Sequence, residues 1–377
     1  MILFYIITAI FLFLYSLLLL YYKIQWDVHE EVSLDKDFSP STFVTILIPA
    51  RNEAANIGHL LKSLLEQDYP KKLMQLIVID DFSEDNTAEI VNQFPSVEYV
   101  HLSASSVERK ANSFKKMAIS LGVTKAKGDL IITTDADCVM CDRWLKAMVS
   151  EYEHGHSVML AGPVIYKTRN NLFHIFQSLD FMSMQGITAA VLQSKKGLMG
   201  NGANLAYEKK VFNEVNGFDD IDHLASGDDM MLMYKVEKAY SGKINYVKSR
   251  DAIVFTDSMP TLSAFVHQRI RWASKSKSLK DKRIQWVLFF VLLMNVGLFA
   301  SLLSVIFYPS FWIYALVLYI IKCIAEYFFL TDIARFFNRQ KLLPYLFLLQ
   351  LWHISYMVFV GILAQFTSYH WKGRKVQ

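Results

Sequence analysis

The chain has 377 residues, of which 53% are hydrophobic and 20% charged, and its formal net charge is +4. This length allows one sizeable domain and a second region, and the hydrophobic share is high for a wholly soluble protein. Three cysteines are too few for a disulfide framework, which excludes a small secreted disulfide scaffold and fits a reducing compartment.

The first apolar stretch covers residues 1–22, carries no charge and is long enough to cross a bilayer, which takes about 20 residues. A cleavable signal peptide would have a basic n-region and small residues before its cleavage site, and this stretch has neither. We therefore expect an uncleaved transmembrane anchor.

Three further apolar stretches cover residues 284–306, 309–330 and 343–366. Residues 23–283 hold nearly all the acidic side chains and indicate one water-facing domain, which ends in a juxtamembrane amphipathic segment. The sequence thus predicts an anchor at 1–22, a domain at 23–283 and a membrane region at 284–377 with about three transmembrane helices.

Basic residues gather near the ends of these spans. Lys23 follows the first span, residues 275–283 (KSKSLKDKR) precede the second, and Arg335, Arg339 and Lys341 precede the last. The excess of positive charge predicts that the domain is cytoplasmic. Because the basic residues adjoin spans and no nucleic-acid motif is present, we expect anionic lipid headgroups and not nucleic acid as their partner.

Two charged residues, Lys322 and Glu326, lie four positions apart inside a predicted span. Charges within a membrane are candidates for a functional path, here one that an acceptor could follow. They could equally neutralise each other on one face of a helix. The sequence leaves both alternatives open.

Between residues 43 and 257, strand-like and helix-like patterns alternate. Apolar runs at 43–50, 76–80, 97–102 and 129–137 predict strands, and the intervening segments have helical spacing. Ser83 is a plausible N-cap of the helix after the second strand. Strands alternating with helices predict βαβ units and a mainly parallel sheet, so the fold class is α/β.

Polar residues follow three of these strands: Arg51, Asn52 and Glu53 after the first, Asp80 and Asp81 after the second, and Asp135 and Asp137 after the fourth. Ligands of such sheets bind beyond the carboxyl ends of the strands. A lone aspartate there is usually a turn former or helix cap. Three acidic clusters at corresponding ends instead indicate a binding site.

Two kinds of metal site are conceivable near residue 137. Asp135 and Asp137 point to the same side of an extended chain and could hold Mg²⁺ or Mn²⁺. Cys138 and Cys141 form a C-x-x-C, but zinc needs four ligands. Because Cys323 lies in a span and no histidines have a suitable spacing, we expect these cysteines to pack in the interior.

Three later segments are also candidates for the site. Glycines 197, 200 and 202 could let a substrate approach the backbone, although no clear strand precedes them as in a dinucleotide fingerprint. Asp228 and Asp229 fit the first turn of a helix. Within HQRIRW, Arg271 could stabilise a diphosphate and Trp272 could stack on a sugar, although an amphipathic helix with an aromatic anchor is a serious alternative.

In this order the segments ILIPARNEAANI, VIDDFSEDNT, DAD, GNGANLAYEKKVFNEVNGFDD, GDD and QRIRW resemble the family 2 glycosyltransferases, over residues 44–272. Gln268, Arg271 and Trp272 match the Q-x-x-R-W of its membrane-integrated branch, which includes cellulose-, chitin- and hyaluronan-synthase-like enzymes and ceramide glucosyltransferase. The resemblance implies an A-type glycosyltransferase fold and inverting transfer from a nucleotide-diphosphate sugar.

The resemblance also implies roles for individual residues. Glu53, Asp80, Asp81 and, as a weaker match, Lys110 would bind the donor nucleotide, and Asp135 and Asp137 would bind the Mg²⁺ or Mn²⁺ that bridges the diphosphate. Asp229 would be the general base, with Asp228 where the family often has glutamate. Gln268, Arg271 and Trp272 would hold the acceptor and the diphosphate.

The acceptor is predicted to be a lipid or a lipid-linked glycan, because four spans are few for one chain to build a polymer channel. A processive polysaccharide synthase is the runner-up. A non-catalytic nucleotide-sugar-binding membrane protein and a nucleotidyltransferase are alternatives of other classes. The sequence identifies neither the sugar nor the oligomeric state.

Overall fold

The computed structural model describes residues 1–35, 37–102, 114–221, 227–274, 282–366, 369–371 and 374–376. The α-helices are α1 (Ile2–Val28), α2 (Ile57–Leu65), α3 (Thr87–Val91), α4 (Phe114–Lys125), α5 (Trp144–Gly155), α6 (Leu172–Gln193), α7 (Lys209–Glu214), α8 (Asp228–Ala239), α9 (Leu262–Ser274), α10 (Lys282–Phe307), α11 (Trp312–Phe336) and α12 (Tyr345–Phe366). The strands are β1 (Val44–Ala50), β2 (Met74–Asp80), β3 (Val97–His101), β4 (Leu130–Thr133), β5 (Val139–Met140), β6 (Met159–Ala161), β7 (Val164–Tyr166), β8 (Leu205–Glu208), β9 (Ile244–Tyr246), β10 (Val254–Thr256), β11 (Tyr369–Trp371) and β12 (Arg374–Val376).

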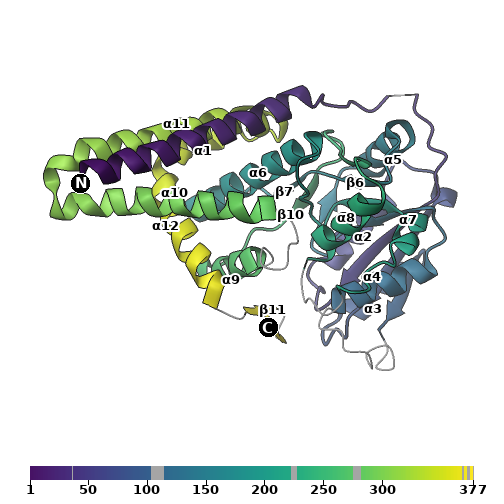
Figure 1. Ribbon diagram of the computed structural model, residues 1–377. Coiled ribbons are helices and arrows are strands. Elements are labelled where there is room, and N and C mark those ends of the chain that lie inside the picture. Colours follow the sequence, from purple (N-terminus) through teal and green to yellow (C-terminus); the bar gives the residue numbers. More distant parts are fainter. Residues whose placement is uncertain are drawn as a thin grey trace. The chain divides into compact units, whose positions relative to one another are not determined.

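The chain forms two compact units (Figure 1). The first consists of Met1–Val28, Thr168–Ala190 and Ser258–Gln377, and it contains the long apolar helices together with most of α6 and all of α9. The second consists of His29–Lys167 and Val191–Asp257 and contains the large sheet.

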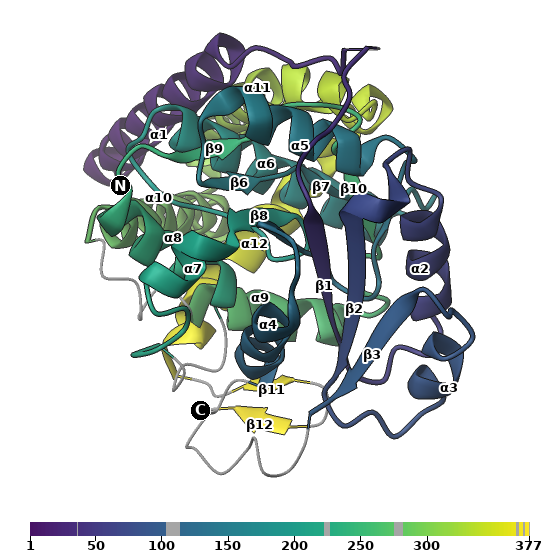
Figure 2. The same cartoon turned by 90° about the vertical axis from the view of Figure 1, so that its right-hand side faces the viewer.

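The sheet of the second unit has seven strands in the order β3-β2-β1-β4-β8-β6-β9. Strand β1 pairs in parallel with β2 and β4, and β2 pairs in parallel with β3 (Figure 2). Strand β8 is antiparallel to both β4 and β6. The predicted α/β fold with a mainly parallel sheet is confirmed.

Strand β1 lies in the centre of the parallel part. Its Val44, Ile46, Leu47 and Ile48 are fully buried, and α4 packs against β1 and β2. A strand buried on both faces needs an unbroken apolar run instead of an alternating one, and VTILI supplies it. This packing brings the carboxyl ends of β1, β2 and β4 to one edge of the sheet, since the three strands run in the same direction.

A smaller sheet has three strands in the order β5-β10-β7. Strand β10 pairs antiparallel with β5 and parallel with β7. The C-x-x-C segment contributes β5, so this pairing fixes the loop that follows β4 against β10.

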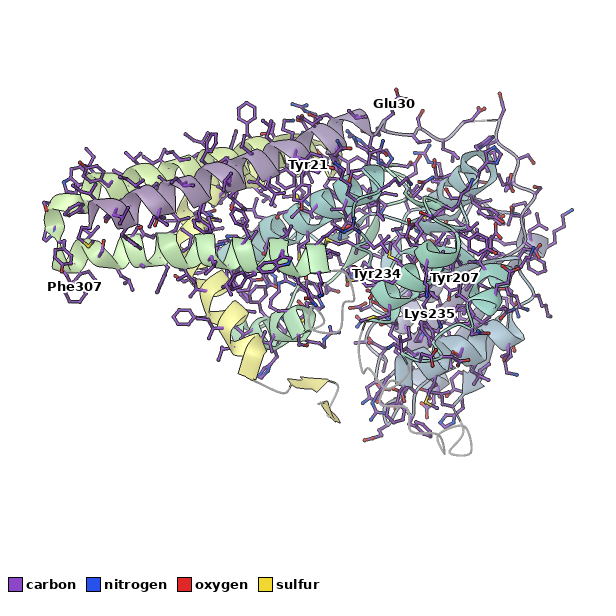
Figure 3. The ribbon with its side chains drawn as sticks, viewed as in Figure 1. Tyr21, Glu30, Tyr207, Tyr234, Lys235 and Phe307 are labelled. Carbon is purple, nitrogen blue, oxygen red and sulfur yellow. The ribbon has the colours of Figure 1, made fainter. Side chains whose placement is uncertain are left out.

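The first unit contains four helices that are long and apolar enough to cross a membrane, counted over the part of the chain that the structure describes: Ile2–Val28, Lys282–Phe307, Pro309–Phe336 and Tyr345–Ala364. They correspond to the four predicted spans. Helix α1 packs against α10 and α11, and α10 packs against α12 (Figure 1). Figure 3 shows Phe307 pointing outward at the end of α10, where 77% of it is exposed.

The charged pair inside α11 is buried and internally paired. Lys322 is fully buried and donates to Glu326, and the Tyr15 hydroxyl of α1 donates to the same carboxylate over 2.8 Å. This geometry favours mutual neutralisation over the alternative of an open polar path.

Helix α6, 22 residues long, was not apparent in the sequence. Its residues up to Ala190 belong to the unit of the apolar helices, and Gly186 lies where a Cβ would collide with Ile333 of α11. Helix α9 belongs to the same unit and packs through Ile270 against Val360 and Ala364 of α12. The juxtamembrane segment is thus joined to the apolar helices by apolar packing.

At Gly128, just before β4, any side chain would collide with the neighbouring strand. A Cβ there would lie 2.5 Å from the Thr45 amide nitrogen and 2.7 Å from the Phe43 carbonyl oxygen, and neither backbone atom can move away alone. We expect Gly128→Ala to lower the free energy of unfolding by about 1–3 kcal/mol. The measurement is the thermal unfolding midpoint in detergent.

Gly58→Ala in α2 is the matched control. A Cβ at Gly58 would meet only Ile90 Cγ2 at 3.4 Å, and alanine favours a helix over glycine by about 0.5–1 kcal/mol. The control should unfold at or above the wild-type temperature. Equal midpoints for the two variants would show that β1 and β4 do not approach each other as described.

Candidate functional site

The loops after β1 and β2 are bonded to each other. The Asp81 amide donates to the Ala50 carbonyl over 2.8 Å, and the Arg51 guanidinium donates to the carbonyls of Asp81 (2.7 Å) and Phe82 (3.0 Å). The Glu53 amide donates to the Thr87 hydroxyl over 2.8 Å. These bonds place Glu53, Asp80 and Asp81 in two adjoining loops, as the parallel pairing of β1 and β2 predicts.

Asp80 has both carboxylate oxygens engaged within the protein. Its Oδ1 accepts bonds from the Ser83 amide (3.1 Å) and hydroxyl, and its Oδ2 accepts a 2.7 Å bond from the Tyr99 hydroxyl. Burial and the Asp80 charge raise the pKa of Tyr99. The N-cap prediction for Ser83 is wrong, because α3 begins at Thr87 and Ser83 donates instead to Asp80.

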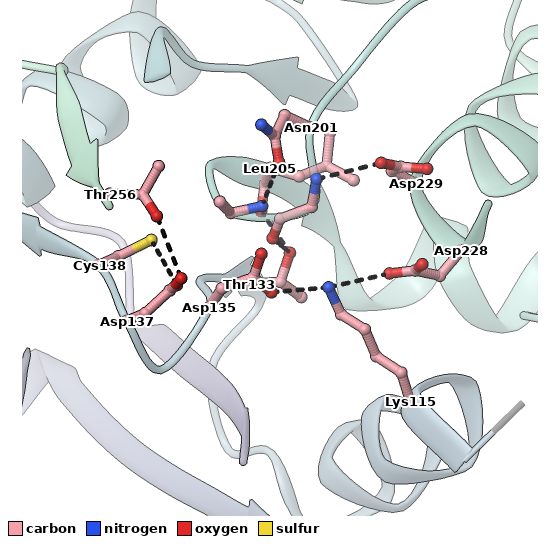
Figure 4. Close-up of polar contacts among 12 residues, drawn as sticks. Lys115, Thr133, Asp135, Asp137, Cys138, Asn201, Leu205, Asp228, Asp229 and Thr256 are labelled. Carbon is pink, nitrogen blue, oxygen red and sulfur yellow. Dashed lines mark hydrogen bonds and ion pairs between the residues drawn. The ribbon is translucent and has the colours of Figure 1, made fainter. Parts of the chain in front are cut away.

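Lys115, in the first turn of α4, joins two of the predicted acidic clusters (Figure 4). Its ammonium group lies 2.7 Å from Asp135 Oδ1 and 3.4 Å from Asp228 Oδ2. Burial alone would lower the pKa of Lys115, but the charges of Asp135, Asp228 and Asp229 raise it above its ordinary value. One ammonium group therefore holds together a carboxylate from the loop after β4 and one from α8.

Asp229 lies beside this ion pair at the start of α8, where the sequence predicted a helix N-terminus. Its Oδ1 accepts a 2.8 Å bond from the Met230 amide, and its Oδ2 faces the Gly202 amide at 3.4 Å. A Cβ on Gly202 would lie 3.3 Å from both Asp228 Oδ2 and Lys115 Nζ. Glycine at position 202 thus lets the loop backbone approach the charged groups.

The loop that contains Gly200 and Gly202 is held in place by Asn204, which is fully buried. Its amide group donates to the Pro163 and Ala252 carbonyls, each over 2.9 Å, and accepts a 3.1 Å bond from the Trp144 indole. The Thr133 hydroxyl at the end of β4 donates to the Gly202 carbonyl over 2.9 Å. These bonds fix the position of the loop relative to the end of β4.

The turn that follows α7 is also fixed. Lys235 of α8 donates to the carbonyls of Asn216 (3.2 Å), Gly217 (2.8 Å) and Asp219 (2.9 Å), and Figure 3 shows its place in the second unit. This one side chain therefore ties the end of the GNGAN-to-FDD segment to the helix that carries Asp228 and Asp229.

Asp137 is directed to the small sheet, away from Lys115 (Figure 4). Its Oδ2 accepts a 3.2 Å bond from Thr256 of β10, and the Cys138 thiol lies 3.7 Å from its Oδ1. The Cys141 thiol donates to the Asp251 carbonyl over 3.2 Å. Burial, followed by the Asp137 charge, raises the pKa of Cys138, so its thiol stays protonated at neutral pH.

The oxygen donors at this edge fit a hard cation better than zinc. Asp135 keeps 38% of its side chain exposed, and the ammonium of Lys115 already occupies a place between carboxylates, as a stand-in for a cation. Across the described ranges no group of three or more His, Cys, Asp and Glu could hold a metal ion. A divalent ion here would take only one or two carboxylates from the protein and the rest of its ligands from phosphate and water.

The predicted site residues divide between the two units. Asp135, Asp228 and Asp229 gather around Lys115 in the second unit, whereas Gln268, Arg271 and Trp272 lie on α9 of the first. Lys110 lies outside the described residues. Sequence reasoning missed Lys115 in a segment with three lysines, and the available signal was its position in the first turn of the helix that precedes the DAD strand.

Comparison with known proteins gives a consistent picture. Residues 45–215 match the family model described as "Glycosyl transferase family 2". The chain is 30% identical over 188 residues to glycosyltransferase AglE of Haloferax volcanii, covering 50% of this chain and 59% of that protein. It is 24% identical over 233 residues to a poly-beta-1,6-N-acetyl-D-glucosamine synthase of Staphylococcus epidermidis, covering 61% of this chain and 53% of that protein. The chain thus spans little more than half the length of these relatives.

Among solved structures, the mannosyltransferase PcManGT of Pyrobaculum calidifontis in complex with GDP-Man and Mn²⁺ has a TM-score of 0.57 at 17% identity, covering 96% of this chain and 98% of that chain. Similarity at this level of identity establishes a shared fold.

The cluster around Lys115 predicts the effect of removing its charge. Lys115→Met leaves Asp135 and Asp228 without their shared counter-ion, and we expect a loss of about 1–2 kcal/mol of stability, reduced by water at the partly exposed Asp135. The raised pKa means that the ammonium stabilises fully below its unfolded pKa of about 10.4, and this contribution disappears only as pH rises through the folded pKa. The loss should therefore be equal at about pH 6 and about pH 8.

Lys125→Met, an exposed position in the last turn of the same helix, is the control for helix propensity and net charge. Thermal unfolding of both variants without nucleotide decides the question. A Lys115→Met midpoint equal to that of Lys125→Met would contradict the shared ion pair.

Proposed function

We propose that the protein is a membrane-bound inverting glycosyltransferase that moves a sugar from a nucleotide-diphosphate sugar to a hydroxyl acceptor, because residues 45–215 match the model of glycosyl transferase family 2. One observation carries this proposal: Asp135, Asp228 and Asp229 converge on Lys115 beside the carboxyl ends of parallel strands. Such an edge is where ligands of α/β sheets bind, and alternating charges suit a diphosphate together with a reacting hydroxyl.

The donor nucleotide would bind along the two joined loops, through Glu53 and Asp81, and Lys110 remains proposed from the sequence alone. Asp80 would act by holding the turn, because Ser83 and Tyr99 already engage its oxygens. Lys115 is added to the proposed donor site. Its ammonium could exchange a carboxylate for a phosphate oxygen, which is also an anionic acceptor of hydrogen bonds.

Asp135 and Asp137 would hold a Mg²⁺ or Mn²⁺ ion, which supplies charge neutralisation at the diphosphate when bound. The Mn²⁺ in the PcManGT complex supports this proposal by analogy. Asp137 accepts a hydrogen bond from Thr256, and Asp135 accepts one from Lys115. These two bonds orient both carboxylates.

Asp229 would remove the proton of the acceptor hydroxyl while the hydroxyl oxygen attacks the anomeric carbon of the donor sugar. In the same step the bond from that carbon to the diphosphate breaks, and the nucleoside diphosphate leaves with the bonding electron pair. The Met230 and Gly202 amides fix the Asp229 carboxylate for this role. Asp228 would keep Lys115 in place, and Arg271 would stabilise the charge of the leaving group.

The acceptor would be a lipid or lipid-linked glycan, met by Gln268, Arg271 and Trp272 of α9. The charges of α11 support this choice, because Lys322 and Glu326 neutralise each other instead of lining a polar path. The name of the polysaccharide-synthase relative supports processive synthesis as the runner-up. The basic residues at the span ends support a cytoplasmic domain.

Asp229→Asn tests the base. We expect transfer to fall about 10²–10⁴-fold, because the amide cannot accept the hydroxyl proton, while nucleotide-sugar binding is retained. The measurements are transfer to acceptor and donor affinity in the same preparation. Near wild-type transfer by this variant would rule out Asp229 as the base.

Asp220→Asn is its matched control. Asp220 is exposed in the same unit, and its φ of 67° is one that asparagine also adopts. It should transfer sugar at the wild-type rate.

The function itself is tested with a panel of nucleotide sugars, with and without Mn²⁺, read by the shift of the unfolding temperature. A stabilising donor is then incubated, radiolabelled, with membrane lipids, and release of nucleoside diphosphate and product length are measured. We expect Mn²⁺-dependent stabilisation and one sugar per lipid. Long products would support the polymer synthase, and binding without nucleoside-diphosphate release would support a non-catalytic binding protein.

A further inference from the structure

Arg269 lies inside the QRIRW segment and has a different environment from the residues at either side of it in the motif. Its side chain is 2% exposed and lies 2.7 Å from Asp180 of α6, whose side chain is 7% exposed. The Arg269 Nε donates to the same carboxylate oxygen over 3.0 Å. One hydrogen bond and one close ionic contact from one guanidinium to one buried carboxylate fix the orientation of α9 relative to α6.

Asp180 has a second partner on a membrane-length helix. Its other oxygen, Oδ1, lies 3.8 Å from Nε2 of His353 in α12, and Nδ1 of His353 lies 3.3 Å from the Lys322 ammonium. Lys322 pairs with Glu326, which accepts a hydrogen bond from the Tyr15 hydroxyl. Polar side chains therefore extend from the middle of the apolar helices towards Asp180 and its partner Arg269 on α9.

The same arginine supports the aromatic residue of the motif. The guanidinium carbon of Arg269 lies 4.1 Å from the centre of the Trp272 ring, and Phe181 of α6 lies 6.0 Å from that ring, centre to centre. The amide of Gln177, one turn before Phe181, bonds the backbone of Met259 in both directions, over 3.0 and 2.9 Å. Helix α6 thus contacts Met259 just before α9, and Arg269 and Trp272 within α9.

We propose that Asp180 is a positioning residue for sugar transfer: its carboxylate holds Arg269, and Arg269 in turn fixes α9 and the Trp272 ring for the acceptor. The inference rests on the proposed function for the role of Trp272, and on the structure alone for the fixing of α9. A buried ion pair adds little net stability compared with apolar residues of equal size, but it specifies one geometry. Specified geometry is what a site that aligns two substrates requires.

Asp180→Asn is the main variant, and purified protein in lipid nanodiscs is used throughout. We expect α9 amides to exchange with deuterium about tenfold faster or more, because local opening no longer breaks the ion pair. Transfer kcat should fall about 10–100-fold from misalignment, with the KM for the nucleotide sugar unchanged. Asp180→Glu keeps the charge and should transfer more than Asp180→Asn.

The matched control is Asp332→Asn. Asp332 lies in the same unit and pairs with Lys23 and Arg335 instead of with α9. It should leave both α9 exchange and transfer at wild-type values. A fall in transfer equal to that of Asp180→Asn would indicate general weakening of the unit and overturn the proposal.

A second variant covers the case in which Asp180→Asn does not fold, since it leaves a buried unpaired guanidinium. Asp180→Asn with Arg269→Gln removes both charges and keeps hydrogen-bonding groups of similar size. It should fold and bind nucleotide sugar, yet still show fast α9 exchange and reduced transfer. Wild-type transfer by this double variant would overturn the proposal.

The two readouts separate the inference from the proposed function. Unchanged α9 exchange in the variants overturns the inference whatever the activity, and fast exchange with full transfer overturns it as well. If the wild-type protein transfers no sugar from any donor, the proposed function fails. The role of Asp180 in fixing α9 is then decided by deuterium exchange alone.

Discussion

Three carboxylates repel one another strongly when they are brought to one edge of a sheet, and the second unit depends on how this repulsion is offset. The ammonium of Lys115 contacts Asp135 and Asp228 directly and lies in the field of Asp229. Lys115 belongs to α4, and α4 packs on β1 and β2. The same helix therefore carries the counter-charge and buries the centre of the sheet. Core packing and assembly of the candidate site are thus coupled.

The rest of the site follows from this constraint. Gly202 has no side chain where the charged groups crowd, and Asn204 and Thr133 hold its loop to the sheet. Asp137 accepts a hydrogen bond from Thr256 and is directed to the small sheet, away from Lys115 (Figure 4). Under the proposed function, a site so arranged would receive an anionic ligand together with its counter-ion.

Features that depend on local pattern could be predicted from the sequence. The apolar run at β1, the start of α8 at Asp228 and the four spans all follow from periodicity, charge and length. Features that depend on tertiary competition could not. Ser83 has the chemistry of an N-cap, but its hydroxyl donates to the Asp80 carboxylate, and α3 begins only at Thr87. Lys115 could not be distinguished from its neighbouring lysines before the face of α4 was known. No prediction is made for α6, where buried polar residues such as Gln177 and Asp180 interrupt the apolar pattern.

The pairing of Lys322 with Glu326 also bears on how the chain enters a membrane. Both charges lie on one helix, one turn apart, so α11 can neutralise itself before α12 has been synthesised. The Tyr15 hydroxyl comes from α1, which is made earlier and can receive the pair at once. His353 of α12 is synthesised last, and its ring lies between the Lys322 ammonium and Asp180 of α6. Insertion of the apolar helices and closure of α9 onto them can therefore be successive events, with the intramembrane charges satisfied at each stage.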